Sequence, residues 1–350
     1  MKKYLSITTL LLSTVFLAGC TLGSSNSTSS TSAAPAVSSI MKSTDGGKSW
    51  EFKSKTSETT SLDSVDVLSI AINPYDGKNI LVGTLKNGIL KTEDGGENWS
   101  LLKFQAEKAY GLAFDYVDSR IIYASGVWQG RGKIFKSING GTDWNEIYTA
   151  PSNGPLVISL ALDKKNSNIV LATTSDNQVI KSTDGGDSWK SIFTSPSPVL
   201  KIAIDVANDN LLYLSLQSGG VLLSKDGGNT IISESPRDVN SGISIIETDP
   251  VNANWVYAAG QAGLLRSKDA GNTWETLKVL GDPKTFPIKA VAINPMSPNE
   301  IIYGAAQAVY KSVDGGMNWM PFQLQTAKTV SALKYSATES GVAYLGLRKN

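Results

Sequence analysis

Few residues of this sequence could act as catalysts or metal ligands, and the residue types that are missing exclude several kinds of site. The 350-residue sequence contains no histidine and one cysteine, Cys20. It therefore excludes Ser-His-Asp and Cys-His catalysis, and it offers no imidazole ligand to a zinc or copper ion. Carboxylates remain, and Asp66 and Asp176 are the pair we consider. Glycoside hydrolysis needs two carboxyl groups roughly 5–10 Å apart. The sequence does not define that separation, so we assign neither residue a catalytic role.

A glycine-rich segment at residues 127–132 combines Trp128 with Arg131. Trp and Arg are frequent in the hot spots of protein interfaces, and an indole ring can also stack on a sugar. Trp128 is one of two tryptophans outside the repeated motif described below. We predict an exposed loop here that contacts a partner. The alternative, in which Trp128 folds back over a neighbouring sheet edge, stays open.

The N-terminal residues have the pattern of an export signal. Lys2 and Lys3 precede an apolar stretch at residues 5–17, which ends in small residues before Cys20. This pattern resembles a bacterial lipobox. It predicts a signal peptide at 1–19 and a Cys20 that carries lipid, including palmitate, as a stable membrane anchor. An ordinary signal peptide is the alternative. We therefore expect an exported protein held to a membrane at the cell surface or facing the periplasm.

The following residues, 20–39, comprise Cys20 and a Ser/Thr-rich stretch with few large apolar side chains. Such a stretch cannot bury enough surface to fold, so we predict a flexible tether. Without Lys2 and Lys3 the chain has 30 basic and 31 acidic residues. This balance argues against a nucleic-acid partner, which normally requires a basic face.

One eight-residue motif, called the box below, recurs through residues 40–350. It runs Ser/Thr, any residue, Asp/Asn, Gly/Ala, Gly, two variable residues and usually Trp. Its copies end 42–49 residues apart, the length of a four-stranded propeller blade. The seven copies occupy residues 43–50, 92–99, 137–144, 182–189, 224–231, 267–274 and 312–319.

The residue types of the box suit a tight turn between two strands. An Asp or Asn side chain accepts hydrogen bonds from turn N–H groups, and glycines adopt positive φ. A Trp that opens the next strand can bury about 150–250 Å². Calcium needs six to eight oxygen ligands, which one or two carboxylates do not supply, so we predict no metal and no cofactor. The predicted structural residues are Asp45, Asp94, Asn139, Asp184, Asp226, Asp269, Asp314, Trp50, Trp99, Trp144, Trp189, Trp274 and Trp319.

Two further apolar segments precede each box after the first, and both also follow the last box. The first series is 68–72, 110–114, 157–161, 200–204, 243–247, 288–293 and 330–334, and the second is 80–83, 121–124, 169–173, 211–215, 255–259, 301–305 and 342–346. Residues 40–350 thus begin with a third strand and end with a second strand. We predict an all-β, seven-bladed propeller of four-stranded blades, closed by pairing N-terminal with C-terminal strands, which removes exposed sheet edges.

The boxes resemble the Asp-box, or bacterial neuraminidase, repeat over about residues 40–350. That superfamily includes sialidases, xyloglucanases, sortilin-type receptors and the photosystem II assembly propeller, with boxes on the periphery away from the functional face. The sialidase Arg-Ile-Pro signature is missing. Xyloglucanases use two propellers around a cleft, whereas one is predicted here. The assembly-factor propeller fits the size and blade number best, although the resemblance does not carry photosynthetic function over to this chain.

The geometry of a propeller places the candidate binding face on the rim opposite the boxes. We expect this face to contain Trp128, Arg131, Tyr110, Arg237, Phe286 and Arg348. The predicted function is a non-catalytic, membrane-tethered scaffold, a monomer that binds an envelope protein. The alternative is a carbohydrate-active protein, either a glycan-binding module or a glycosidase-like propeller.

Overall fold

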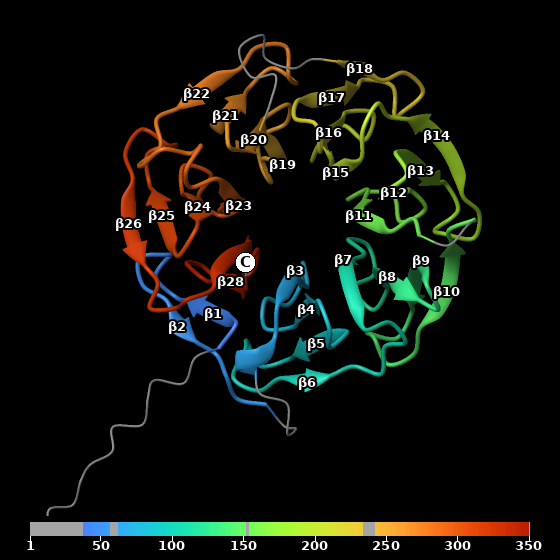
Figure 1. Cartoon of the computed structure of the whole chain (residues 1–350), viewed down its shortest axis with the longest axis horizontal. Helices are drawn as coiled ribbons and strands as arrows, with labels where there is room; N and C mark the ends of the chain where they lie inside the picture. Colours follow the sequence, from blue (N-terminus) through green and yellow to red (C-terminus); the bar gives the residue numbers. More distant parts are fainter. Residues whose placement is uncertain (1–37, 57–61, 152–153, 234–241, 350) are drawn as a thin grey trace, which may run out of the picture. The chain divides into compact units, whose positions relative to one another are not determined.

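The computed structural model describes residues 38–56, 62–151, 154–233 and 242–349. These residues form seven four-stranded antiparallel sheets arranged as the blades of a ring (Figure 1). The prediction of an all-β, seven-bladed propeller is therefore confirmed. The helical part of the described chain is one short 3-10 turn, Leu62–Ser64. No helix in this part is long and apolar enough to span a membrane.

We number the blades in chain order, so blade one comprises β3–β6, blade six β23–β26, and blade seven β27, β28, β1 and β2. The inner strands, nearest the centre in Figure 1, are β3 (Val67–Ile72), β7 (Lys108–Phe114), β11 (Val157–Leu162), β15 (Val199–Ile204), β19 (Ile243–Thr248), β23 (Ile288–Ile293) and β27 (Thr329–Tyr335). The second strands are β4 (Ile80–Thr84), β8 (Ile122–Trp128), β12 (Val170–Thr174), β16 (Leu212–Leu216), β20 (Val256–Gly260), β24 (Ile301–Ala305) and β28 (Ala343–Arg348).

The remaining strands complete each blade toward the periphery. The third strands are β1 (Ile40–Ser43), β5 (Ile89–Thr92), β9 (Arg131–Ser137), β13 (Gln178–Ser182), β17 (Val221–Ser224), β21 (Gly263–Ser267) and β25 (Ala308–Ser312). The outer strands are β2 (Glu51–Phe52), β6 (Ser100–Leu101), β10 (Asn145–Thr149), β14 (Lys190–Thr194), β18 (Ile232–Ser233), β22 (Glu275–Leu277) and β26 (Met320–Gln323).

Burial explains why the second strands are mostly apolar. Every residue of β4, β12, β16, β20 and β24 is buried, because both faces of each blade pack against neighbouring blades. The outer strands, by contrast, consist mostly of exposed and half-buried residues. The hydrophobic core is accordingly a series of inter-blade layers, and a strand buried on both faces needs apolar residues on both.

The ring closes as predicted, through the pairing of chain segments from opposite ends. In blade seven β1 pairs antiparallel with β28, with Ile40 opposite Gly346 and Ser43 opposite Ala343. Ser38 and Ser39, which the sequence placed at the end of the tether, are fully buried. The Ser39 hydroxyl donates to the Leu62 carbonyl at 2.9 Å, and its N–H donates to the same oxygen at 3.2 Å. The folded part therefore includes these two serines, because the blade satisfies their polar groups. The predicted signal peptide, Cys20 and most of the tether lie outside the described residues.

Candidate functional site

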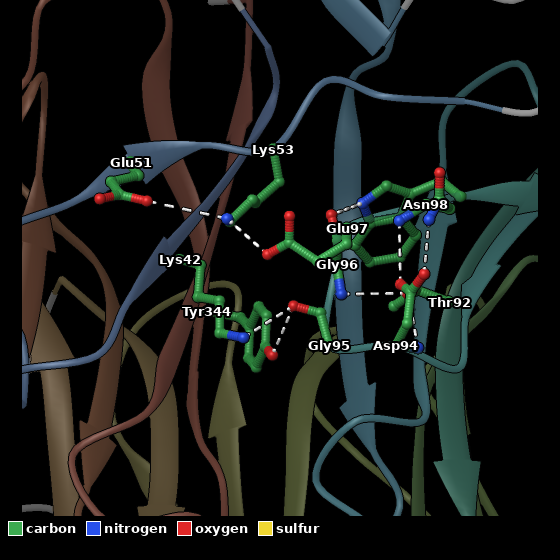
Figure 2. A network of polar contacts seen from close by, with 11 residues as sticks. Lys42, Glu51, Lys53, Thr92, Asp94, Gly95, Gly96, Glu97, Asn98 and Tyr344 are labelled. Atoms are coloured by element: carbon green, nitrogen blue, oxygen red, sulfur yellow. Dashed lines mark hydrogen bonds and ion pairs between the residues drawn. The ribbon is translucent and has the colours of Figure 1, made fainter.

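The box carboxylates are saturated by hydrogen bonds within their own turns. In blade one Asp94 Oδ1 accepts from the Thr92 hydroxyl at 2.8 Å and from the Asn98 N–H at 2.9 Å. Asp94 Oδ2 accepts from Asn98 Nδ2 at 2.7 Å (Figure 2). Desolvation is the largest single influence and opposes ionisation, but the hydrogen bonds together outweigh it and hold the pKa of Asp94 at about 2. A carboxylate so occupied is a structural acceptor rather than a proton donor or a metal ligand.

The box of blade one also anchors the preceding blade, through a contact that the sequence reasoning missed. Lys42 Nζ and the Tyr344 hydroxyl, both from blade seven, donate to the Gly95 carbonyl at 2.9 Å and 3.0 Å (Figure 2). Lys53 forms an ion pair with Glu97 at 2.7 Å. A Lys or Arg directly precedes the first box residue in every copy except that of blade four, where it is Leu223. This recurring cation was the sequence pattern that could have predicted the contact. Four more cations donate to a carbonyl in the box of the next blade: Lys91 to Gly140, Lys136 to Gly185, Lys181 to Gly227 and Arg266 to Gly315.

On the opposite rim Trp128 ends β8 and pairs with Arg131, the first residue of β9. The prediction of a glycine-rich loop at residues 127–132 was wrong. Gln129 and Gly130 take positive φ values of 52° and 74°, which closes a two-residue turn and lets the hairpin continue to its tip. Trp128 is 38% exposed.

The tip of this hairpin is fixed to the loop that enters blade three. The Arg131 guanidinium donates to the Ala150 carbonyl, so it supports the loop rather than projecting freely into solvent. Gly132 N–H donates to the Pro155 carbonyl at 3.1 Å, and its own carbonyl accepts from Ala150 at 2.9 Å. A Cβ on Gly132 would lie 2.3 Å from the Pro155 oxygen, which restricts this position to glycine. These hydrogen bonds hold the backbone next to Trp128 in place.

The other predicted face residues are dispersed around the ring. Tyr110 belongs to blade two with Trp128, but it lines the central cavity. Phe286 is 53% exposed in the loop before β23 of blade six. Arg348 ends β28 in blade seven, and Arg237 lies outside the described residues. The structure thus pairs Trp128 with Arg131, whereas Tyr110 lies on the inner strand of the same blade and Phe286 and Arg348 belong to other blades.

Asp66 and Asp176 are engaged with different partners in different parts of the ring. Asp66 precedes β3 in blade one, and its Oδ1 accepts from the Lys349 N–H at 2.7 Å. Asp176 lies between β12 and β13 in blade three, and its Oδ1 accepts from the Thr174 hydroxyl. The two carboxylates thus lie in blades one and three and are held by different partners.

A cavity of about 510 Å³ runs along the centre of the ring, lined by the inner strands from Leu68 at one end to Pro74 at the other. Glu247 is the one carboxylate among the described residues that line it. Desolvation raises the pKa of Glu247, but the charges of Lys334 and Lys201 outweigh this effect and keep its pKa below the ordinary value. Glu247 is therefore ionised near neutral pH, which does not suit a general acid. The described part of the chain holds no cluster of three or more potential metal ligands.

Comparison with known proteins supports the fold without selecting a function. No protein-family model and no curated protein sequence matches the chain. The GH74 xyloglucanase from Xanthomonas campestris superposes with a TM-score of 0.70 at 16% identity, over 81% of this chain and 51% of that one. YCF48 bound to a D1 peptide gives 0.61 at 13% identity, over 81% and 93%. YCF48 from Cyanidioschyzon merolae gives 0.60 at 18% identity, over 81% and 95%. The chain thus spans about half the length of the xyloglucanase and most of the length of YCF48.

Proposed function

We propose that this chain is a non-catalytic propeller, tethered to a membrane through Cys20, that holds a protein partner of the cell envelope against the tip of the β8–β9 hairpin. The observation that carries the proposal is the exposure of Trp128. This large aromatic side chain is 38% exposed, on a hairpin whose backbone is held in place by the contacts of Gly132 and Arg131. An aromatic anchor that loses little freedom on binding is typical of interface hot spots.

The carboxylates described above support a non-catalytic role. The box carboxylates with pKa values near 2 are occupied within their turns. Glu247 faces two lysines, and Asp66 and Asp176 bind separate partners. Hydrolysis of a glycosidic bond needs one carboxyl group that is protonated near neutral pH. Glu247 and these box carboxylates, whose pKa values are lowered, do not provide one.

A structural neighbour of similar length lends support to a protein partner. The YCF48 structure contains a D1 peptide, so a propeller of this size can bind a polypeptide. The lipid anchor at Cys20 rests on the sequence pattern of residues 1–20. Two acyl chains would hold the propeller stably at a membrane surface.

Crosslinking and pull-down from native membranes test the proposal. We compare the unmodified chain with Trp128→Ala and with Ile138→Ala, a matched control on the opposite rim of the same blade whose side chain is 63% exposed. A hot-spot truncation costs about 2 kcal/mol or more of binding free energy. We therefore expect an envelope protein that is recovered with the chain and with Ile138→Ala, and lost with Trp128→Ala. Equal recovery by both variants would contradict the assignment of this face.

The same exposed indole favours a second candidate, a glycan-binding propeller, because a sugar ring can stack on it. Glycan-array binding that depends on Trp128, together with a pull-down that recovers polysaccharide and no protein, would favour this candidate. Release of reducing sugar by the chain would contradict both, since neither includes catalysis.

A further inference from the structure

The inner strands align residue by residue across the seven blades, and two blades depart from the pattern. The next-to-last residue of the inner strand pairs with the second residue of the next strand in every blade, for example Ala71 with Leu81 and Glu247 with Tyr257. Alanine occupies this position in blades one, two, three, four and six: Ala71, Ala113, Ala161, Ala203 and Ala292. Blade five has Glu247 and blade seven has Lys334. The cavity wall is thus mainly small and apolar, with charges at two equivalent places.

A third charge joins these two from the neighbouring blade. Lys201 of blade four lies two residues before this position, where the other blades have Ser, Gly, Ile or Ala. Lys334 Nζ lies 3.2 Å from both oxygens of Glu247, and Lys201 Nζ lies 3.8 Å from Oε1. The three side chains are 21–40% exposed, and that exposure faces the cavity, which all three line.

Lys164 adds a further cation at the cavity end where the inner strands meet the turns of the box rim. Its Nζ lies 5.5 Å from the centre of the Tyr116 ring, and both residues line the cavity. Among the described residues Lys164 has no ion-pair partner within 4.0 Å. Glu247, Asp205 and Asp249 attract it electrostatically. The carboxylates of Asp205 and Asp249 accept N–H groups of the adjacent turns, and neither of these two residues lines the cavity.

The lysines that line the cavity outnumber its carboxylates. Its described walls carry four lysines, Lys164, Lys201, Lys289 and Lys334, against Glu247, an excess of three positive charges. The pKa of Lys164 lies below its ordinary value because of desolvation and repulsion by Lys334. Attraction to Glu247 raises the pKa of Lys201, but desolvation and repulsion by Lys334 outweigh it. Confining like charges in a partly desolvated space is costly, and a bound anion would remove that cost.

We propose that the central cavity is a binding site for a small oxyanion, a phosphate or carboxylate group held by Lys164, Lys201 and Lys334. Ammonium groups are strong donors to such oxygens. Glu247 positions Lys201 and Lys334 and at the same time competes with the ligand for their charge. A volume of about 510 Å³ admits a phosphate together with ordered water. The site is separate from Trp128, so it stands independently of the proposed function.

Isothermal titration calorimetry on the purified full-length chain tests the site, with inorganic phosphate and succinate as separate probes at constant ionic strength. We expect saturable binding of at least one probe. The Lys201→Met, Lys334→Met double variant should weaken it at least tenfold, since each hydrogen bond to a charged group contributes about 1.5–3 kcal/mol. The Lys190→Ala, Lys284→Ala variant removes the same charge from exposed positions outside the cavity and should bind as the unmodified chain does.

Glu247→Gln gives the decisive result, because the effect has the opposite sign. Removal of the competing carboxylate should raise the affinity by roughly tenfold, whereas a purely structural role for Glu247 predicts no gain. This measurement also decides the matter should the double lysine variant fail to fold. Absence of binding of both probes, or binding that is unchanged in Glu247→Gln and in the double lysine variant, would overturn the proposal.

Discussion

Two sets of charged residues on this ring follow opposite patterns. The box residues repeat in every blade, and Asp45, for example, accepts from the Lys48 and Ser49 N–H groups at 2.9 Å and 3.0 Å within its own turn. The cavity residues do not repeat, since Glu247 and Lys334 replace an alanine that five other blades share. In this fold the residues that repeat from blade to blade therefore stabilise local turns. The residues that differ between blades, such as Glu247 and Lys334, are ones that the propeller fold does not require.

The largest expected effect concerns a box residue buried between blades. Trp99 is 1% exposed and packs with Ile40 and Tyr344 of blade seven, while its Nε1 donates to the Gly96 carbonyl at 3.1 Å. We expect Trp99→Ala to lower the free energy of unfolding by about 3–5 kcal/mol, through loss of packing and creation of a cavity. Urea unfolding followed by far-UV circular dichroism measures the change.

Trp128→Ala is the matched control for this prediction, because it removes the same side chain from an exposed position. Its free energy of unfolding should stay within about 0.5 kcal/mol of the original value. Equal destabilisation by the two substitutions would break the distinction between structural and exposed tryptophans.

Acid should destabilise the boxes together. Hydrogen bonds hold the pKa values of Asp94, Asp184 and Asp314 at about 2, against the ordinary value of 3.8. Because these values are lower in the folded state, the unfolded chain binds more protons in this range. Stability is therefore fully present above about pH 4 and is lost as pH falls toward 2. Urea unfolding at pH 5, 4, 3 and 2 tests this.

Blade two supplies the natural control for the acid prediction. There Asn139 replaces the aspartate, and Asn139 Oδ1 still accepts from the Asp143 N–H at 3.0 Å. Asp184→Asn should copy this arrangement and reduce the steepness of the fall in stability below pH 4. An unchanged dependence on pH would show that other carboxylates cause the acid sensitivity.

A smaller effect is expected from a buried hydroxyl in the box of blade two. Ser137 is fully buried, and its Oγ accepts from the Gly141 N–H at 2.9 Å. Ser137→Ala leaves that buried donor without a partner, which costs about 1–3 kcal/mol. In the same box Thr142→Ala removes an exposed hydroxyl that donates to the Asn139 carbonyl, and should cost less than about 0.5 kcal/mol. Thermal unfolding of both variants compares them, and equal losses would contradict the assigned role of Ser137.

The sequence predicted the fold because the information for it is local and repeated. The Ser or Thr of each box ends its third strand as predicted, and closure between β1 and β28 followed from counting strands. The contacts of Lys42 and its equivalents with the next box were missed, although a cation recurs at that position. The recurring cation was visible in the sequence, but the carbonyl that it contacts belongs to a neighbouring blade, and the sequence does not show which residues of two blades meet.

The cavity charges were not predicted, for a different physical reason. Lys201, Glu247 and Lys334 lie in three blades, and only the register of the inner strands brings Glu247 and Lys334 to the same level, two residues from that of Lys201. Trp128 shows the converse case. Its exposure followed from the sequence, but its place in a strand did not, because Gln129 adopts positive φ without being glycine.

The smallest expected effect concerns the stability that the cavity charges provide. Replacing an ion pair by apolar residues of similar size is often neutral, whereas removing one partner leaves an uncompensated charge. We therefore expect the Glu247→Met, Lys334→Met double variant to unfold within about 1 kcal/mol of the original chain. Glu247→Met alone should be less stable than the double variant, because Lys201 and Lys334 then repel each other without compensation. A loss above about 3 kcal/mol in the double variant would mean that the charges hold the ring together. The distinction between repeated structural residues and non-repeated cavity residues would then fail.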